Sequence, residues 1–169
     1  LNMDVTPRYN DFVVKFANVN GSGSASANGL FARAILRMGV PVAARNIFPS
    51  NIQGLPTWYE VRVVEDGWRG RRGGVDLVVA MNPQTWDKDI AELDSGGYLF
   101  YDSTRPLPPS RFRDDVTTLG IPLTAICNAE YTDARQRQLF KNIIYLGALS
   151  ALLDIDPAEI EKLFGEQYK

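Results

Sequence analysis

The segment from Val75 to Met81 (VDLVVAM) constrains the fold most, because it is almost continuously apolar over the length of one strand. A strand of this kind is buried on both faces, as in a parallel sheet covered by helices. Strand-like and helical segments alternate on both sides of it, which indicates about six strands and four or five helices. We therefore predict a Rossmann-like α/β protein, with three α/β/α layers around a largely parallel or mixed sheet.

The individual elements follow from hydrophobic spacing and from cap signals. Strands are predicted at 12–19, 40–48, 58–65, 75–81, 98–102 and 121–126, with 58–65 exposed on one face or at an edge. Helices are predicted at 26–38, from Asn82 to about Leu93, at 133–153, and from Asp156 to the end. The stretch 143–153 is almost wholly apolar but too short to span a bilayer, so we expect it to be buried in the core.

The chain contains no histidine and one cysteine, Cys127. Without histidine it lacks Ser-His-Asp and Cys-His catalytic machinery, and zinc sites that need histidine. A single cysteine forms no internal disulfide and cannot hold an iron–sulfur cluster through four thiolates. We therefore predict no catalytic residue and no metal site here, so the demanding chemistry of any reaction must come from elsewhere.

Length and charge set the broad class. The 169 residues fit one domain, and 18 basic against 20 acidic residues give a net charge of −2, which argues against non-specific nucleic-acid binding. The chain lacks an apolar run long enough for a membrane helix, and it lacks a secretory signal. We expect a soluble cytoplasmic domain, with neither a nucleic acid nor a membrane as partner.

Because the sequence ends directly after a well-capped helix, we also expect residues 1–169 to be a fragment of a longer chain.

The glycine-rich segment after the first strand, NGSGSASANG (20–29), is the best candidate for a ligand site. Ligands of α/β sheets bind beyond the carboxyl ends of the strands. Four segments are predicted to reach that edge: 20–28, 49–57, 81–83 and 102–104. Glycines at 21 and 23 let the backbone turn tightly, serines offer hydroxyls, and the following helix presents free N–H groups. This combination suits an anion, above all a phosphate.

The turn is not a complete dinucleotide fingerprint. Gly21-x-Gly23 is present, but Ser26 replaces the third glycine, and no acidic residue stands between Gly23 and Glu60 to hold a ribose. The same interval contains three basic residues, Arg33, Arg37 and Arg45. This pattern disfavours NAD as the ligand. A ligand with an extra phosphate, such as NADP or coenzyme A, remains compatible with it. A tight turn without any ligand is the alternative, and the missing P-loop lysine disfavours ATP hydrolysis.

Four other features favour structural roles. The basic segment WRGRRGG (68–74) could bind an acidic partner, but it is more typical of a solvated hairpin tip. Asp102 at a strand end is predicted to cap a turn, and Cys127 to be a buried structural thiol. Asn142, within the long helix, is expected to face polar partners instead of a substrate.

Four sequence blocks follow one another over nearly the whole chain: NGSGSASANGLFARAILRMG, SNIQGLPTWYEVRV, VDLVVAMNPQTWDKDIAELDSGGYLFYDS and NIIYLGALSALLDIDPAEIEKLF. In this order the chain resembles the gamma subunit, or gamma-type domain, of the 2-oxoacid:ferredoxin (acceptor) oxidoreductases, which include pyruvate, 2-oxoglutarate and indolepyruvate ferredoxin oxidoreductases. The elements that carry the resemblance are Gly21 to Gly29, Glu60-x-Arg62, Asn82-Pro83 and Asp102-Ser103.

The chain departs from this family at two of those elements. The more common Gly-Gly-Gln-Gly run is replaced by residues 22–26 (SGSAS), and the usual Arg-Gly-Gly by 62–64 (RVV). The loop 51–57 (NIQGLPT) resembles a subgroup in which the gamma domain is fused ahead of the alpha subunit. The substrate stays undefined, because members that act on different 2-oxoacids share this domain.

The resemblance implies a role in converting a 2-oxoacid, coenzyme A and oxidised ferredoxin into acyl-CoA, CO₂ and reduced ferredoxin. Thiamine diphosphate, Mg²⁺ and iron–sulfur clusters would belong to the alpha, beta and delta-type parts, with the alpha part fused to this domain. The domain would be inactive alone, pack on the thiamine-binding parts and help to bind coenzyme A. The residues expected at that contact are Gly21, Ser22, Gly23, Ser24, Ser26 and Asn28, with Asn51, Gln53, Asn82 and Ser103 as lesser candidates. The alternatives are a free-standing NADP-type oxidoreductase or nucleotide-binding module, and a purely structural interaction domain.

Overall fold

The computed structural model describes residues 11–49, 52–64 and 74–167. The strands are β1 (Asp11–Val19), β2 (Val42–Ile47), β3 (Pro56–Val64), β4 (Val75–Ala80), β5 (Leu93–Asp102) and β6 (Thr117–Ile121). The helices are α1 (Ser24–Arg37), α2 (Trp86–Ala91), α3 (Leu123–Glu130), α4 (Ala134–Leu152) and α5 (Pro157–Gln167), with two short 3₁₀ turns, η1 (Pro83–Thr85) and η2 (Pro109–Arg111). Among the described residues, no helix is both long and apolar enough to cross a lipid bilayer.

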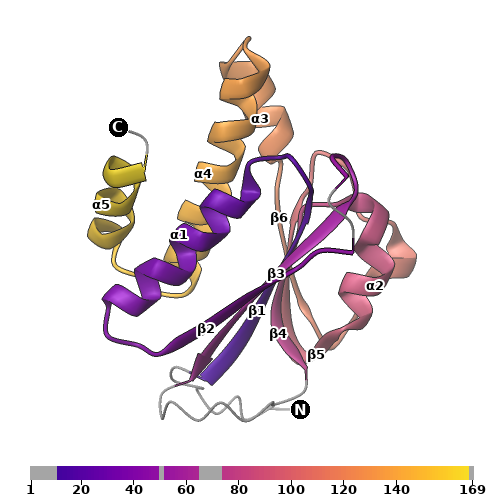
Figure 1. The fold of residues 1–169 in the computed structure, drawn as a ribbon. Helices are drawn as coiled ribbons and strands as arrows, with labels where there is room; N and C mark the ends of the chain where they lie inside the picture. Colours follow the sequence, from indigo (N-terminus) through magenta and orange to yellow (C-terminus); the bar gives the residue numbers. More distant parts are fainter. Residues whose placement is uncertain (1–10, 50–51, 65–73, 168–169) are drawn as a thin grey trace.

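The six strands form one mixed sheet in the order β2-β3-β1-β4-β5-β6. Strands β1, β4, β5 and β6 run parallel, whereas β3 is antiparallel to both β1 and β2. Helices α1, α4 and α5 cover one face of the sheet, and α2 covers part of the other (Figure 1). The predicted three-layer α/β fold with a largely parallel or mixed sheet is therefore confirmed.

Each face of the sheet has its own hydrophobic core. The larger core joins β1, β3 and β4 to α1, α4 and α5, and Phe16 meets Phe31 edge to face at its centre, with ring centroids 5.3 Å apart. The smaller core packs Trp86 and Ile90 of α2 against β4 and β5. Strand β4 contributes to both cores, which explains its continuous apolar sequence.

The capping residues predicted from the sequence mark the starts of several helical elements correctly. Asp133 accepts a hydrogen bond from the Gln136 amide at 2.9 Å, and Asp156 accepts one from the Ala158 amide at 2.9 Å. Asn82 likewise accepts from the Gln84 amide at 3.1 Å. These side chains satisfy amide groups that the first helical turn leaves without a partner.

Two structural predictions were wrong, and two others hold only in part. The segment 121–126 is not a strand: β6 ends at Ile121, and α3 begins at Leu123, directly after Pro122. The helix expected to run to about Leu93 ends two residues earlier, at Ala91, because β5 begins at Leu93. The segment 58–65 is not at an edge, because β2 is the edge strand and β3 lies inside the sheet, but one face of β3 is partly exposed at Glu60 and Arg62, as the other alternative expected. Finally, 143–153 is buried on one side only, since Leu152 is 40% exposed.

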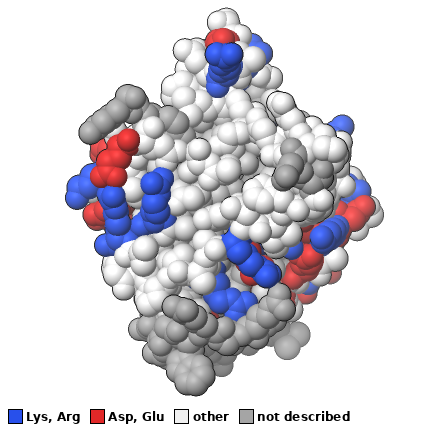
Figure 2. All heavy atoms as spheres, in the orientation of Figure 1, with Lys and Arg blue, Asp and Glu red and all other residues white. Residues whose placement is uncertain are grey.

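Charged side chains are unevenly distributed on the surface. Figure 2 shows them over α5 and the C-terminal part of α1 on one side, and over α2 on the other. The same view shows basic side chains below the middle of this face and a charged group at its upper tip, whereas the middle of the face is largely uncharged. The carboxyl ends of the parallel strands, with the turn that leads into α1, lie at this part of the molecule (Figure 1).

Candidate functional site

The turn after β1 is joined to the loop after β2 by backbone hydrogen bonds. The Asn20 amide donates to the Leu55 carbonyl at 2.8 Å, and the Gly54 amide donates to the Asn20 carbonyl at 2.9 Å. Nearby, the Met81 amide donates to the Ala17 carbonyl at 2.9 Å. We call this region the carboxyl edge: the turn 20–23, the loop 52–55, and the residues that directly follow β4 and β5. Three of the four predicted ligand segments thus meet at the turn.

Glycines allow the conformation of this turn. Gly21 has φ +84° and Gly23 has φ +73°, both in the left-handed region that other residues rarely adopt. Gly23 is the N-cap of α1, and no side chain in the described residues caps that end. The first turn of α1 contains no acidic residue. Its amide groups and the positive end of the helix dipole are therefore suited to an anion.

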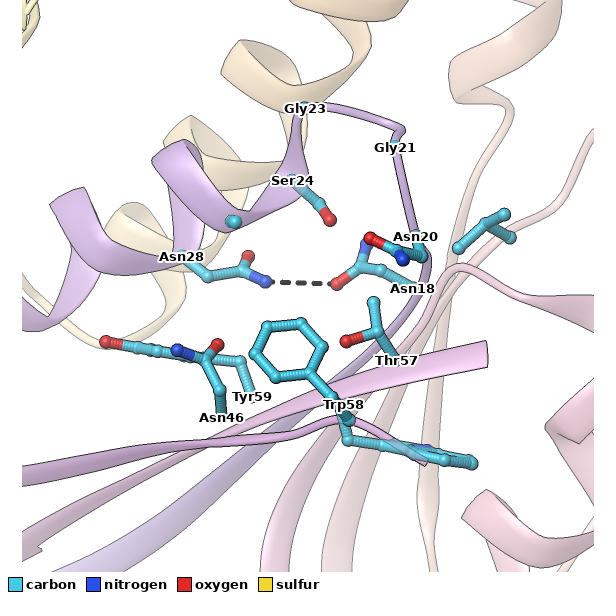
Figure 3. A pocket seen from close by; sticks show the side chains of 13 residues that line it. Asn18, Asn20, Gly21, Gly23, Ser24, Asn28, Asn46, Thr57, Trp58 and Tyr59 are labelled. Carbon is cyan, nitrogen blue, oxygen red and sulfur yellow. Dashed lines mark hydrogen bonds between the residues drawn. The ribbon is translucent and has the colours of Figure 1, made fainter. Parts of the chain in front are cut away.

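One pocket of about 240 Å³ lies between α1 and the ends of β1, β2 and β3 (Figure 3). We call it the amide pocket, because its polar lining consists mainly of neutral amides and hydroxyls. Phe48 and Tyr59 add aromatic surface, and the polar members are Asn18, Asn20, Ser24, Asn28, Asn46 and Thr57. The indole of Trp58 points to the other side of the sheet, where its Nε1 donates to Asp89 at 2.8 Å.

A buried hydrogen-bond chain braces the amide pocket. The Asn28 amide nitrogen donates to Asn18 Oδ1 at 3.0 Å, and Asn28 Oδ1 accepts from the Tyr145 hydroxyl at 2.7 Å. Asn28 is 2% exposed and Tyr145 is fully buried. This chain fixes α1 to β1 and α4, so Asn28 holds the pocket wall as well as lining it.

We expect Tyr145→Phe to lower the free energy of unfolding by about 1–3 kcal/mol, because it removes the hydroxyl that satisfies a buried amide oxygen. Urea unfolding of the wild-type and variant chains measures the change. Tyr98→Phe is the matched control, since Tyr98 is 41% exposed and its replacement should change stability by less than about 0.5 kcal/mol. Equal losses in the two variants would contradict the assigned role of the Tyr145 hydroxyl.

A second pocket, of about 370 Å³, lies on the other side of the same turn. We call it the lysine pocket, after Lys141 of α4, and its lining also includes Gln53, Gln138 and Asn142. Asn142 is 4% exposed and donates to the Ser22 carbonyl at 3.2 Å. Asn142 thus has the polar partner that the sequence predicted, and it also lines the pocket.

Lys141 belongs to a polar cluster at the end of β5. Its Nζ lies 3.2 Å from Asp102 Oδ2 and donates to Thr124 Oγ1 at 3.0 Å. Burial raises the pKa of the Asp102 carboxyl, but hydrogen bonds from Thr124 and Thr104 and the charge of Lys141 outweigh it, so the pKa lies below its usual value. Asp102 also accepts from the Thr104 amide at 3.1 Å, which confirms its predicted capping role.

Six of the ten predicted site residues line one or both pockets. Gly21, Gly23, Ser24 and Asn28 line the amide pocket, and Gly21, Ser22 and Gln53 line the lysine pocket. Three others do not line either pocket: Ser26 is exposed on α1, Asn82 is a buried cap of η1, and Ser103 is half-buried after β5. Asn51 lies outside the described residues, as does most of the basic segment 68–74.

The three arginines that suggested a phosphate ligand lie elsewhere. Arg33 donates to Gln167 at 2.6 Å and Arg37 pairs with Glu166 at 2.8 Å, so both contact α5. Arg45 on β2 pairs with Glu60 at 3.3 Å. The cation that the sequence did not reveal is Lys141, which α4 brings to the turn. Cys127 is buried and burial raises its thiol pKa, which confirms a structural thiol.

Comparisons with known proteins place these features in context. Residues 13–169 match the family model described as pyruvate ferredoxin/flavodoxin oxidoreductase. No curated protein sequence matches the chain significantly. Among the described residues, no group of three His, Cys, Asp or Glu side chains is placed to hold a metal ion.

Three solved structures share the fold. A 2-oxoglutarate:ferredoxin oxidoreductase from Magnetococcus marinus, with 2-oxoglutarate, coenzyme A and succinyl-CoA bound, has a TM-score of 0.83 at 23% identity, over 95% of this chain and 27% of that chain. The PORC subunit of pyruvate oxidoreductase from Thermotoga maritima has a TM-score of 0.71 at 21% identity, over 94% of this chain and 85% of its own. The gamma subunit of a keto/oxoacid ferredoxin oxidoreductase from Geobacter sulfurreducens has a TM-score of 0.72 at 22% identity, over 92% of this chain and 86% of its own. The chain thus spans about a quarter of the Magnetococcus chain and most of the other two.

Proposed function

Because the chain belongs to the pyruvate ferredoxin/flavodoxin oxidoreductase family, we propose that it is the gamma-type domain of a thiamine-diphosphate-dependent 2-oxoacid:ferredoxin oxidoreductase and that it binds coenzyme A at its carboxyl edge. The observation that carries the proposal is the glycine-rich turn. It forms a wall of both pockets and leads into a helix end that has no side-chain cap in the described residues. This arrangement suits a long ligand with both phosphate groups and neutral polar groups.

The pockets are suited to binding rather than to proton transfer. The described residues that line the amide pocket include no titratable group other than Tyr59, whose phenol has a pKa raised by burial. Of the described residues that line the lysine pocket, Lys141 is the one that carries a charge. The chain's own residues would therefore hold and orient coenzyme A, while a neighbouring part of the enzyme carries out the reaction.

The proposed reaction divides between this chain and its partners. A 2-oxoacid loses CO₂, two electrons pass to ferredoxin, and the acyl group is transferred to the sulfur of coenzyme A. Thiamine diphosphate with Mg²⁺ supplies the decarboxylation chemistry, and iron–sulfur clusters carry the electrons; both belong to alpha, beta and delta-type parts, the alpha part either fused or separate. The absence of histidine and the single buried cysteine in this chain support that division.

Titration with coenzyme A and with NADP tests the ligand. We expect the assembled enzyme that contains this chain to bind coenzyme A with micromolar affinity, and NADP at least about tenfold more weakly. That factor corresponds to the loss of one charge-assisted hydrogen bond. Isothermal titration without 2-oxoacid measures both affinities. Tighter binding of NADP would instead favour a nucleotide-binding module. The structure offers less support for that alternative, because Arg33, Arg37 and Arg45 each contact other residues away from the turn.

A further inference from the structure

The turn at the carboxyl edge separates two pockets of different electrostatic character. Both pockets share Asn18, Val19, Asn20 and Gly21 in their linings. Among the described residues, the lining of the amide pocket contains no charged side chain, whereas that of the lysine pocket contains Lys141. A ligand that lies across the turn therefore meets a neutral environment at one end and a cation at the other.

Lys141 is placed to respond to an anion in its pocket. Its side chain is 22% exposed, so it keeps access to the pocket while Asp102 and Thr124 hold its Nζ. Asp102 offsets the charge of Lys141 when the pocket holds no anion. A lysine can turn its ammonium group towards a phosphate with little change in the backbone, because its four-carbon side chain is flexible.

We propose that Lys141 is the residue that recognises a phosphate group of coenzyme A, with the phosphate in the lysine pocket and an uncharged part of the same ligand in the amide pocket. This inference rests on the proposed function and adds a specificity-determining residue on α4, a helix from which the sequence analysis predicted no ligand contact. The nearby end of α1, with no side-chain cap in the described residues, would strengthen the same phosphate contact.

The test compares ligands with and without phosphate in the assembled enzyme. Lys141→Gln should lower the affinity for coenzyme A about tenfold or more, the loss expected for one hydrogen bond to a charged group, and leave pantetheine affinity unchanged. Lys141→Arg should restore most of the affinity for coenzyme A. Lys162→Gln is the matched control: Lys162 lies on α5 with a side chain 64% exposed, and its replacement should change neither affinity.

A second variant separates charge recognition from a structural effect. Asp102→Asn removes the countercharge of Lys141, so the affinity for coenzyme A should rise several-fold while pantetheine affinity stays the same. In turnover, Lys141→Gln should raise the KM for coenzyme A and leave kcat at saturating coenzyme A unchanged. Higher ionic strength should weaken coenzyme A binding more in the wild type than in Lys141→Gln.

Three outcomes would overturn the inference. Unchanged coenzyme A affinity in Lys141→Gln would remove Lys141 from the site, although the proposed function would stand. Equal losses for coenzyme A and pantetheine would assign Lys141 a structural role. Failure of the wild-type enzyme to bind coenzyme A would overturn the proposed function and this inference together.

Discussion

Replacing Gly21 with alanine should both destabilise the chain and weaken coenzyme A binding. Gly21 has φ +84°, and a Cβ at this position would lie 2.7 Å from Gln53 Cγ. Non-glycine residues in the left-handed region cost about 1–2 kcal/mol, and the contact with Gln53 adds to that cost. We expect a loss of about 1–3 kcal/mol in urea unfolding. Affinity for coenzyme A should fall about tenfold or more, because the turn can no longer present its amides.

Gly29→Ala is the matched control for this variant. Gly29 lies within α1, and a Cβ there would meet no atom within 4 Å. Alanine should stabilise the helix by about 0.5–1 kcal/mol and leave coenzyme A affinity unchanged. If Gly21→Ala bound coenzyme A as tightly as the wild type, the turn would not be the phosphate site.

The second large effect is expected at Asp89 on the opposite face of the sheet. Asp89 is fully buried and accepts hydrogen bonds from Trp58 Nε1 at 2.8 Å and Thr85 Oγ1 at 2.5 Å. Asp89→Ala would leave both donors without this acceptor and open a cavity, so we expect a loss of about 2–4 kcal/mol. Asp89→Asn keeps the shape and the acceptor for Trp58, and should retain most of the stability.

The two Asp89 variants should also differ from the wild type in pH dependence. Burial raises the pKa of Asp89 in the folded chain above its value in the unfolded chain. Between those two pKa values the folded state holds the proton more tightly, so stability falls as the pH rises through that window. Asp89→Asn should lack this contribution. Urea unfolding between about pH 3.5 and 7 measures it.

Asp87→Asn controls for the loss of a carboxylate in the same helix. Asp87 is largely exposed and pairs with Arg111 at 2.5 Å, and exposed ion pairs contribute at most about 1 kcal/mol. If Asp89→Asn kept the pH slope of the wild type in that window, another group would be responsible. If Asp89→Ala were as stable as Asp87→Asn, the buried hydrogen bonds would not stabilise the fold.

Local sequence signals predicted most of the fold and the glycine-rich turn at the carboxyl edge. The turn after β1 was found because Gly21 and Gly23 lie between a strand pattern and a helix pattern, and strand order then brings neighbouring segments to one edge. The caps at Asp133 and Asp156 were found because capping depends on residues close in sequence. The family that the sequence resembles is also the one whose family model matches residues 13–169.

Contacts between distant residues could not be predicted in the same way. Lys141 reaches the turn only because α4 packs beside α1, and Tyr145 reaches Asn28 across 117 positions. Arg33 is close to Gly23 in sequence, but ten helical residues carry it about 15 Å along the helix axis. The strand predicted at 121–126 was wrong for another reason. A short apolar run fits a strand or a helix equally well, and α3 begins directly after Pro122.

The most direct test is an experimental structure of the assembled oxidoreductase with coenzyme A bound. We expect phosphate oxygens within hydrogen-bonding distance of the amides at the start of α1 and of Lys141 Nζ, with another part of the ligand in the amide pocket. Coenzyme A bound elsewhere, with side chains of a partner subunit filling both pockets, would show that the glycine-rich turn serves assembly and not ligand binding.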